Sequence, residues 1–98
     1  MTNLINLNLK FMKPFLHFLL TSIVNHPDDI VIEEEINDGH LALKLTVAEA
    51  DMGVVIGKHG QTIAALRTIV RLRNQVTQEF TSVVVHLQEH AQPETPIS

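Results

Sequence analysis

The stretch VVIGKHGQTI, residues 54–63, decides the fold. Two glycines, Gly57 and Gly60, enclose Lys58 and His59 between an apolar run and a helical pattern. This arrangement predicts a tight turn between two helices. Glycines let a ligand approach the backbone closely, and the positive end of the second helix points into the turn. Together with one full charge and an imidazole that can donate a hydrogen bond, these features predict a phosphate site.

The residues after the turn add backbone donors. Gln61, Thr62 and Ile63 open the second helix, where the first N–H groups have no acceptor within the helix. A G-x-x-G spacing by itself is a weak signal, because a plain turn between two helices accounts for most instances. The interpretation therefore depends on the elements around the turn.

The distribution of charge is compatible with a polyanion at this turn. The chain has 98 residues and a formal net charge of -4. Residues 1–51 hold three basic and eight acidic residues, residues 52–78 hold four basic and no acidic ones, and residues 79–98 hold three acidic and no basic ones. A polyanion responds to the local field rather than to the net charge. The acidic average therefore does not exclude nucleic acid as a ligand.

Hydrophobic patterning predicts one α+β domain. The predicted elements are a helix (12–25), two strands (30–36 and 41–47), a short helix (48–56), a helix from 61 to near Asn74 and a strand (82–88). Such an order folds into a three-stranded sheet covered by helices on one face. We assign residues 12–90 to this domain and residues 91–98 to a flexible tail. Residues 1–11 form an N-terminal extension, for which the pattern leaves a short strand, an extension of the first helix and a loose segment open.

The same patterns predict which side chains are buried. In the first helix an apolar stripe is expected in the core, namely Phe11, Phe15, Phe18, Leu19, Ser22 and Ile23, broadened by Leu16, Leu20 and Val24. In the second long helix the stripe is Ile63, Leu66, Ile69 and Val70.

The strands carry their own signals. An Asp38–Gly39 pair between two alternating runs predicts a hairpin. Ile30, Ile32 and Ile36 share one face of the first strand with Glu34 as the exception. Lys44 is expected to pair across the ladder with the glutamates. In the short helix Glu49 and Asp51 are expected to face the positive helix end.

Several classes of function are excluded by what the sequence lacks. There is no cysteine, no nucleophile motif and no P-loop, and the six histidines are scattered over different elements. Lys10 and Lys13 precede an apolar run as in a signal peptide, but His17 interrupts the run, no cleavage site follows, and the run is too short to cross a membrane. We therefore expect a cytoplasmic protein with no enzymatic activity, no metal site, no cofactor, no small-molecule substrate and no membrane partner.

Two segments carry a resemblance to a known family. The stretch DMGVVIGKHGQTIAALRTIV (51–70), with VNHPDDIVIEEEI (24–36) before it, resembles KH domains of the small bacterial single-KH proteins of the KhpA type. The similarity covers roughly residues 12–88. It implies a type II KH fold with the order α-β-β-α-α-β, and it implies binding of single-stranded RNA.

The resemblance also implies roles for individual residues. Gly57, Lys58, His59 and Gly60 would hold phosphate, and the candidates for an adjoining apolar groove are Val55, Ile56, Ile63 and Val54. Some of these four must instead be core, and the sequence does not assign each one. The chain has no Trp or Tyr, so an aliphatic groove replaces aromatic base stacking.

The arginines of the second long helix leave two interpretations. Arg67 and Arg71 stand four residues apart on one face, where they either form a solvated surface or extend the phosphate track. Arg73 leaves that face and is the weakest candidate of the three.

Partners and physiological role follow from the resemblance alone. KhpA-type proteins form homodimers, and heterodimers with a larger KH protein of the KhpB (Jag) type. The family implies a role as RNA chaperone or post-transcriptional regulator, linked in some bacteria to cell elongation and division. The alternative is a KH-fold interaction module with little RNA affinity, which uses its loop and helices only to dimerise. The acidic average and the single lysine of the loop keep this alternative open.

Overall fold

The computed structural model describes residues 12–89 of the chain. Its elements are α2 (Met12–Thr21), a 3-10 turn (Pro27–Asp29), β1 (Val31–Asn37), β2 (His40–Thr46), a 3-10 turn (Glu49–Asp51), α3 (Met52–Ile56), a 3-10 turn (Lys58–Gly60), α4 (Gln61–Thr77) and β3 (Ser82–Leu87). The predicted α+β architecture and the order α-β-β-α-α-β are confirmed. The expectations for the N-terminal extension and the tail lie outside the described residues.

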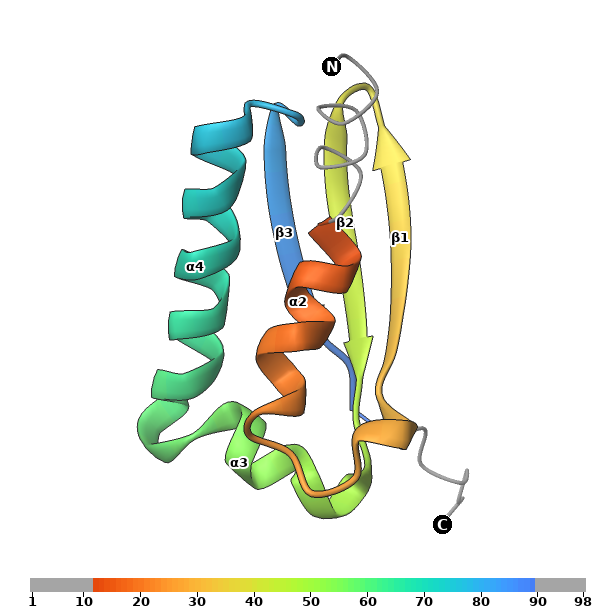
Figure 1. Cartoon of the computed structure of the whole chain (residues 1–98), viewed down its shortest axis with the longest axis vertical. Coiled ribbons are helices and arrows are strands. Elements are labelled where there is room, and N and C mark those ends of the chain that lie inside the picture. Colours follow the sequence, from red (N-terminus) through yellow and green to blue (C-terminus); the bar gives the residue numbers. More distant parts are fainter. Residues whose placement is uncertain (1–11, 90–98) are drawn as a thin grey trace, which may run out of the picture.

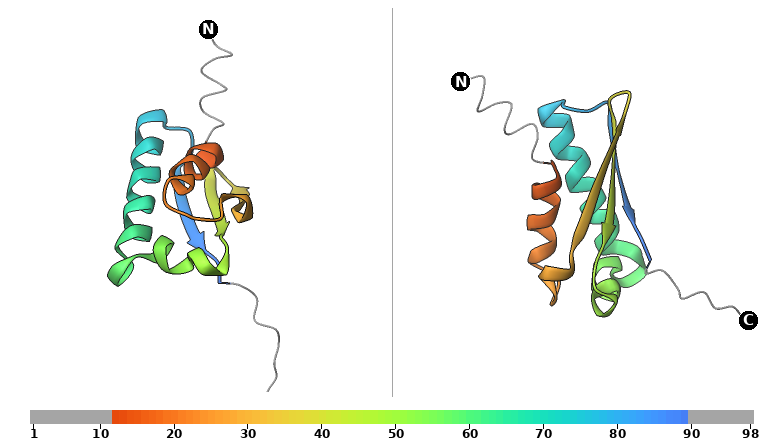
Figure 2. Two further views of the ribbon diagram at one scale, coloured as in Figure 1. Left: turned by 60° about the horizontal axis from the view of Figure 1, so that its bottom comes forward. Right: turned by 90° about the vertical axis from the view of Figure 1, so that its right-hand side faces the viewer.

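The three strands form one sheet in the order β1-β2-β3. β1 and β2 are antiparallel, whereas β2 and β3 are parallel. Parallel neighbours need a crossover connection, and α3 and α4 supply it (Figure 1). The side view in Figure 2 places the helices on one face of the sheet and leaves the other face uncovered. The turn between α3 and α4 therefore lies at one end of the molecule, within the crossover.

The hairpin between β1 and β2 forms as predicted. Asp38 and Gly39 have φ angles of 52° and 80°, the left-handed conformation that a two-residue hairpin turn needs. The resulting register pairs Asn37 with His40. On the uncovered face the Nζ atom of Lys44 lies 3.3 Å from Oε1 of Glu35, so the predicted cross-strand ion pair is confirmed.

The core lies between the sheet and the helices. β2 contributes three fully buried side chains, Leu41, Leu43 and Leu45, and α2 contributes Met12, Leu16 and Leu20. The buried apolar residues are Met12, Leu16, Leu20, Val24, Ile32, Leu41, Leu43, Leu45, Val47, Val55, Ile63, Leu66, Val70, Val83 and Val85. This core fixes α3 and α4 against the strands and with them the turn that connects the two helices.

The expected end of α2 is wrong by four residues. The helix ends at Thr21 rather than at residue 25. The hydroxyl groups of Thr21 and Ser22 donate to the carbonyls of Phe18 and Leu19, both at 2.7 Å. Such bonds compete with the helical ladder, and the chain turns towards Pro27.

The expected core stripe of α2 is also wrong in part. The fully buried side chains include Met12, Leu16 and Leu20, whereas Phe18 is 70% exposed. Apolar residues occur on every side of this helix, so their spacing does not define one face. The sheet selects the face, and Phe18 is left in solvent.

α4 continues past Asn74, where the sequence predicted its end, to Thr77. Asn74 is buried, donates from Nδ2 to the Phe80 carbonyl (2.9 Å) and accepts from the Phe80 N–H at Oδ1 (3.0 Å). The asparagine therefore fixes the loop that follows instead of ending the helix. Ile69 also differs from expectation, because its side chain is 39% exposed.

Candidate nucleic-acid interface

The turn between α3 and α4 is built from left-handed backbone. Gly57 caps the end of α3 and has φ 79° and ψ 169°, a combination that is essentially confined to glycine. His59 (φ 56°) and Gly60 (φ 73°) are also left-handed, and a short 3-10 turn spans Lys58–Gly60. Three positive φ angles in four residues reverse the chain within one tight loop.

A side chain would have different surroundings at the two glycines of the loop. A Cβ atom on Gly57 would lie 2.6 Å from the backbone nitrogen of Thr62 and would collide with its side chain. A Cβ atom on Gly60 would meet nothing within 4 Å. The first glycine thus allows close packing of the loop on the start of α4, and the second leaves an open approach to the backbone.

The backbone donors at the loop are fewer than the sequence suggested. The N–H of Gly60 donates to the Gly57 carbonyl (3.1 Å), and the N–H of Gln61 donates to the Lys58 carbonyl. The expectation that Gln61 opens α4 with an unpaired N–H is therefore wrong, because the 3-10 turn uses that group. Among the three predicted donors, Thr62 and Ile63 remain in the first helical turn, where an intrahelical acceptor is lacking.

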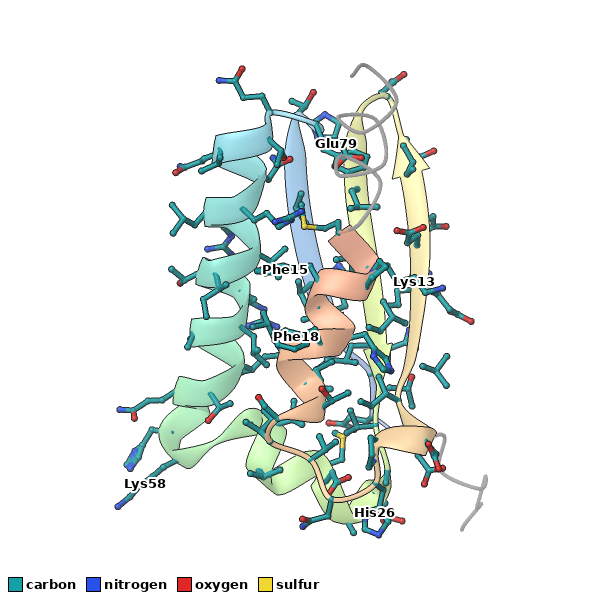
Figure 3. The ribbon with its side chains drawn as sticks, viewed as in Figure 1. Lys13, Phe15, Phe18, His26, Lys58 and Glu79 are labelled. Carbon is teal, nitrogen blue, oxygen red and sulfur yellow. The ribbon has the colours of Figure 1, made fainter. Side chains whose placement is uncertain are left out.

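The side chains of Lys58 and His59 are exposed. Figure 3 shows Lys58 at the corner between α3 and α4, pointing away from the body of the protein. No acidic residue occurs between residues 52 and 78, the segment that contains Lys58 and His59. The corner combines two basic groups with the positive end of a 17-residue helix.

The apolar candidates separate into two pairs. Val55 and Ile63 belong to the core, with 0% and 8% of their surface exposed. Val54 and Ile56 are 45% and 39% exposed. Only the second pair lies on the surface, and this resolves the choice that the sequence left open.

The three arginines have distinct environments. Nε of the partly buried Arg67 donates to the Val85 carbonyl on the edge strand β3 (3.0 Å). Arg71 is exposed and lines a groove of about 370 Å³ between α4 and the start of β3. The guanidinium of Arg73 stacks over the ring of Phe15, 4.8 Å from its centroid. Arg67 and Arg71 therefore follow the edge between α4 and β3, whereas Arg73 fixes α4 to α2.

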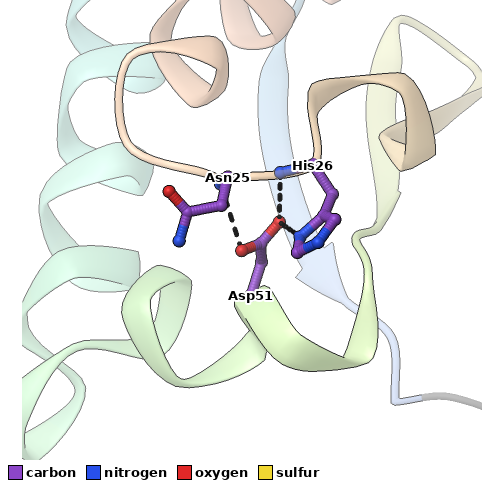
Figure 4. A network of polar contacts seen from close by, with 3 residues as sticks. All are labelled: Asn25, His26 and Asp51. Atoms are coloured by element: carbon purple, nitrogen blue, oxygen red, sulfur yellow. Dashed lines mark hydrogen bonds and ion pairs between the residues drawn. The ribbon is translucent and has the colours of Figure 1, made fainter.

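A carboxylate buried beside α3 was missed by the sequence analysis. Asp51 is 1% exposed and accepts hydrogen bonds from the N–H groups of Asn25 (3.1 Å) and His26 (2.9 Å), as Figure 4 shows. Nδ1 of His26 lies 3.2 Å from Oδ2 of the same carboxylate. Asp51 lies at the N-cap of α3, at the positive end of the short helix as expected. Its carboxylate forms no capping hydrogen bond there and instead ties the loop after α2 to the start of α3. The partners lie 25 and 26 residues away, so no local pattern could have indicated them.

This network has a consequence for the dependence of stability on pH. Burial by itself raises the pKa of Asp51, but the hydrogen bonds from Asn25 and His26 outweigh it and hold the pKa below its ordinary value. A carboxyl with a lowered folded-state pKa stabilises the fold above the unfolded-state pKa of about 3.9, and this contribution is lost as pH falls through the folded-state pKa.

Replacing Asp51 by Asn should therefore lower the Tm at pH 7 by roughly 5–10 °C. The two N–H groups bond to different carboxylate oxygens, and in Asn one of these oxygens is replaced by an NH2 group that can only donate. The parent should also lose more Tm between pH 7 and pH 3 than the variant does, as measured by circular dichroism. Asp28→Asn, an exposed carboxylate in the neighbouring 3-10 turn, is the control and should leave the Tm unchanged. An unchanged Tm for the Asp51 variant at pH 7 would contradict this role.

Across residues 12–89, no helix combines the length and apolarity needed to cross a membrane. In the same residues no three His, Asp or Glu side chains gather as a set that could hold a metal ion.

Comparison with known proteins gives a consistent result. A family model described as KhpA/KhpB, KH domain, matches residues 13–88. RNA-binding protein KhpA of Bacillus subtilis is 48% identical over 52 residues, which are 53% of this chain and 64% of that protein, just under two thirds of its length. The Listeria monocytogenes protein of the same name is 42% identical over 60% of this chain and 78% of its own length. RNA-binding protein KhpA of Chlamydia caviae is 40% identical over 66% of this chain and 87% of its own length.

Proposed function

Because the chain belongs to the KhpA/KhpB KH-domain family, we propose that it binds single-stranded RNA at the loop between α3 and α4. The three relatives described above are each named as RNA-binding proteins, and none is named as an enzyme. The observation that carries the proposal is the loop itself. Its left-handed glycines enclose two exposed basic residues at the start of a long helix.

The loop holds the RNA backbone. Gly57 and Gly60 let a phosphate approach the chain, while Lys58 supplies a charge and His59 a donor. The N–H groups at the start of α4, at Thr62 and Ile63, add the helix dipole to these side chains, and the exposed Gln61 side chain lies beside them.

The exposed and the buried apolar residues near the loop have different roles. Val54 and Ile56 are exposed on α3 and contact the bases of the nucleotides that the loop holds. Val55 and Ile63 lie beneath them in the core and hold α3 and α4 at a fixed spacing. A base platform without aromatic rings gives weak affinity and little sequence preference.

Arg67 and Arg71 extend the phosphate track from the loop along the edge between α4 and β3. The support is the groove beside Arg71 and the position of Arg67 at the edge strand. Arg67 also holds a β3 carbonyl, so its substitution is expected to weaken the fold as well as RNA binding. A substitution of Arg71 therefore tests the phosphate track with less effect on the fold.

The second part of the proposal is that the chain acts as a homodimer through α4. Ala65, Ile69, Leu72 and Val76 are exposed and follow the 4-3-4 spacing of a helix–helix seam. Leu72 and Val76 are 56% and 78% exposed, on the side of α4 away from the buried stripe. A small domain gains by covering such a stripe, and two RNA sites in one particle raise the apparent affinity.

The dimer has a direct test in Leu72→Asp. The parent should run at twice the 11.0 kDa of one chain in size-exclusion chromatography with light scattering. The variant should run as a monomer, with the dissociation constant raised roughly 100-fold, because a carboxylate would be buried without a partner. Val84→Asp on the uncovered face of the sheet, where Val84 is 42% exposed, is the control and should leave the dimer intact. A monomeric parent, or a dimeric Leu72→Asp variant, would refute the role of α4.

The physiological role proposed with this chemistry is that of a cytoplasmic RNA chaperone or post-transcriptional regulator. The same α4 stripe fits a larger KH partner of the KhpB (Jag) type, and a link to cell elongation and division follows from the family resemblance. Weak contacts through a backbone loop suit a protein that engages many RNAs for short times.

The competing function is a KH-fold module that dimerises and has little RNA affinity. Reversing both charges of the loop, in Lys58→Asp/His59→Asp, distinguishes the two functions when binding of a labelled hexaribonucleotide is measured by fluorescence anisotropy. RNA binding that depends on the loop supports the proposal, and binding that is absent in the parent supports the module.

A further inference from the structure

One part of the helix-covered face of the sheet has no cover among the described residues. Ile32 and Ile36 lie on the same face of β1, since they are four residues apart on one strand. Ile32 is 5% exposed beneath α2, but Ile36 is 57% exposed although its cross-strand neighbour Leu41 is 1% exposed. α2 begins at Met12 and leaves the β1 segment near the hairpin uncovered (Figure 1).

A hollow of about 430 Å³ lies at this place. Its walls are Met12, Glu34, Ile36, Glu79 and Phe80. Met12 belongs to the core and Phe80 packs against it, so the hollow opens directly onto the hydrophobic core. Its other side is acidic, with Glu34 on the inward face of β1 and Glu79 after α4. Figure 3 shows Glu79 at the end of the molecule where the β1–β2 hairpin lies. The surface therefore fits an apolar segment that carries one positive charge.

The segment before Met12 has this chemistry. Residues 1–11 read MTNLINLNLKF, with apolar side chains at Met1, Leu4, Ile5, Leu7, Leu9 and Phe11. Lys10 is its single charged side chain. The segment is joined to Met12, a wall of the hollow, and eleven residues span up to about 36 Å when extended. A covalent tether of this length gives a high effective concentration at the hollow.

We propose that residues 4–11 fold back over this hollow within the same chain. Their leucine and isoleucine side chains cover Ile36 and Phe80, and the Lys10 ammonium lies between Glu34 and Glu79. Pro14 has no N–H to offer the carbonyl of Lys10, so a bend at this point costs no helical hydrogen bond. The family match begins at residue 13, so this cover is an addition to the family domain rather than part of it.

The contact can be measured in the full-length chain. With methyl labelling, the Ile36 Cδ1 methyl group should give nuclear Overhauser effects to methyl groups of Leu4, Ile5, Leu7 or Leu9. The effects should persist when labelled chain is mixed with excess unlabelled chain, because the contact is intramolecular. The amide of Ile36 should also exchange slowly with solvent.

Variants of the full chain connect the contact to stability. Ile5→Ser/Leu7→Ser/Leu9→Ser should remove the Overhauser effects and lower the Tm by roughly 5–10 °C. Ile36→Ser should lower the Tm by a similar amount. Its matched control is Val31→Ser on the opposite face of β1, where Val31 is 50% exposed, and this variant should change the Tm by about 2 °C at most.

The charge arrangement gives an independent measurement. Lys10→Glu should lower the Tm, and adding Glu34→Lys should restore part of the loss, as expected for a direct pair. The proposal is overturned if Ile36 has no contact with residues 4–11. It is overturned equally if the contact arises only between labelled and unlabelled chains, since the surface would then be an interface between copies.

Discussion

The Gly57→Ala variant should lose about 2–6 kcal/mol of stability and its RNA affinity with it. Alanine disfavours φ 79° with ψ 169°, and residues forced into such sparsely populated regions cost about 1–3 kcal/mol. In addition, the new methyl group would lie 2.6 Å from the Thr62 nitrogen, and relieving a clash of this kind in packed surroundings costs about 1–3 kcal/mol. Small domains have a total stability of about 5–15 kcal/mol, so this one methyl group removes a large share. The loop must also shift away from the start of α4.

Two other glycines provide matched controls for the same substitution. Gly60→Ala meets no neighbour within 4 Å and should cost only about 1–2 kcal/mol for its left-handed conformation. Gly53→Ala lies inside α3 with open space around it and should stabilise by about 0.5–1 kcal/mol. Urea denaturation monitored by circular dichroism measures all three. Equal losses at Gly57 and Gly60 would show that close packing on Thr62 does not constrain the loop.

Features with local causes could be predicted from the sequence. The Asp38–Gly39 turn forms because only a few residue types adopt two successive positive φ angles. The α3–loop–α4 arrangement was likewise indicated by glycines between two apolar helical runs. In both cases the deciding interactions lie within a few residues of one another.

Features that depend on distant parts of the chain could not be predicted. The buried face of α2 is set by the sheet, and Phe18 is therefore exposed although its spacing is compatible with a core position. Asp51 carries no local sign that its partners are Asn25 and His26. The position of Arg67 depends on β3, which follows it in the chain by some fifteen residues and lies beside α4 only in the folded protein.

The candidate site shows the same division. The backbone of the loop was predicted, while the number of its available N–H groups was overestimated, because the 3-10 turn uses that of Gln61. The separation of exposed Val54 and Ile56 from buried Val55 and Ile63 needed the packing of α3 and α4. A sequence pattern gives the residue types at a site, and tertiary packing decides which of them reach solvent.

Reversing the loop charges is the second substitution with a large expected effect. Lys58 and His59 are exposed, so their replacement by Asp leaves the core unchanged. Hydrogen bonds to charged groups contribute about 1.5–3 kcal/mol each, and two carboxylates would also repel the RNA backbone. We therefore expect the affinity for a hexaribonucleotide at pH 7 to fall roughly 100-fold, with an unchanged Tm and an unchanged dimer.

Lys13→Asp/His17→Asp is the matched control, because it makes the same two substitutions at exposed positions four residues apart on α2. It changes the net charge by the same amount at a site remote from the loop in sequence. We expect its RNA affinity to stay within about threefold of the parent. A general loss of attraction for RNA would weaken both double variants alike.

The most direct test of the RNA-binding loop is this affinity measured across a salt series for the parent and both double variants. With two to four phosphate contacts, the slope of log K against log[salt] should be roughly -1.4 to -2.8 for the parent. The control should keep this slope, and Lys58→Asp/His59→Asp should flatten it by about 1.4 as two contacts are lost. A folded loop variant that binds RNA with the affinity and slope of the parent would contradict the account.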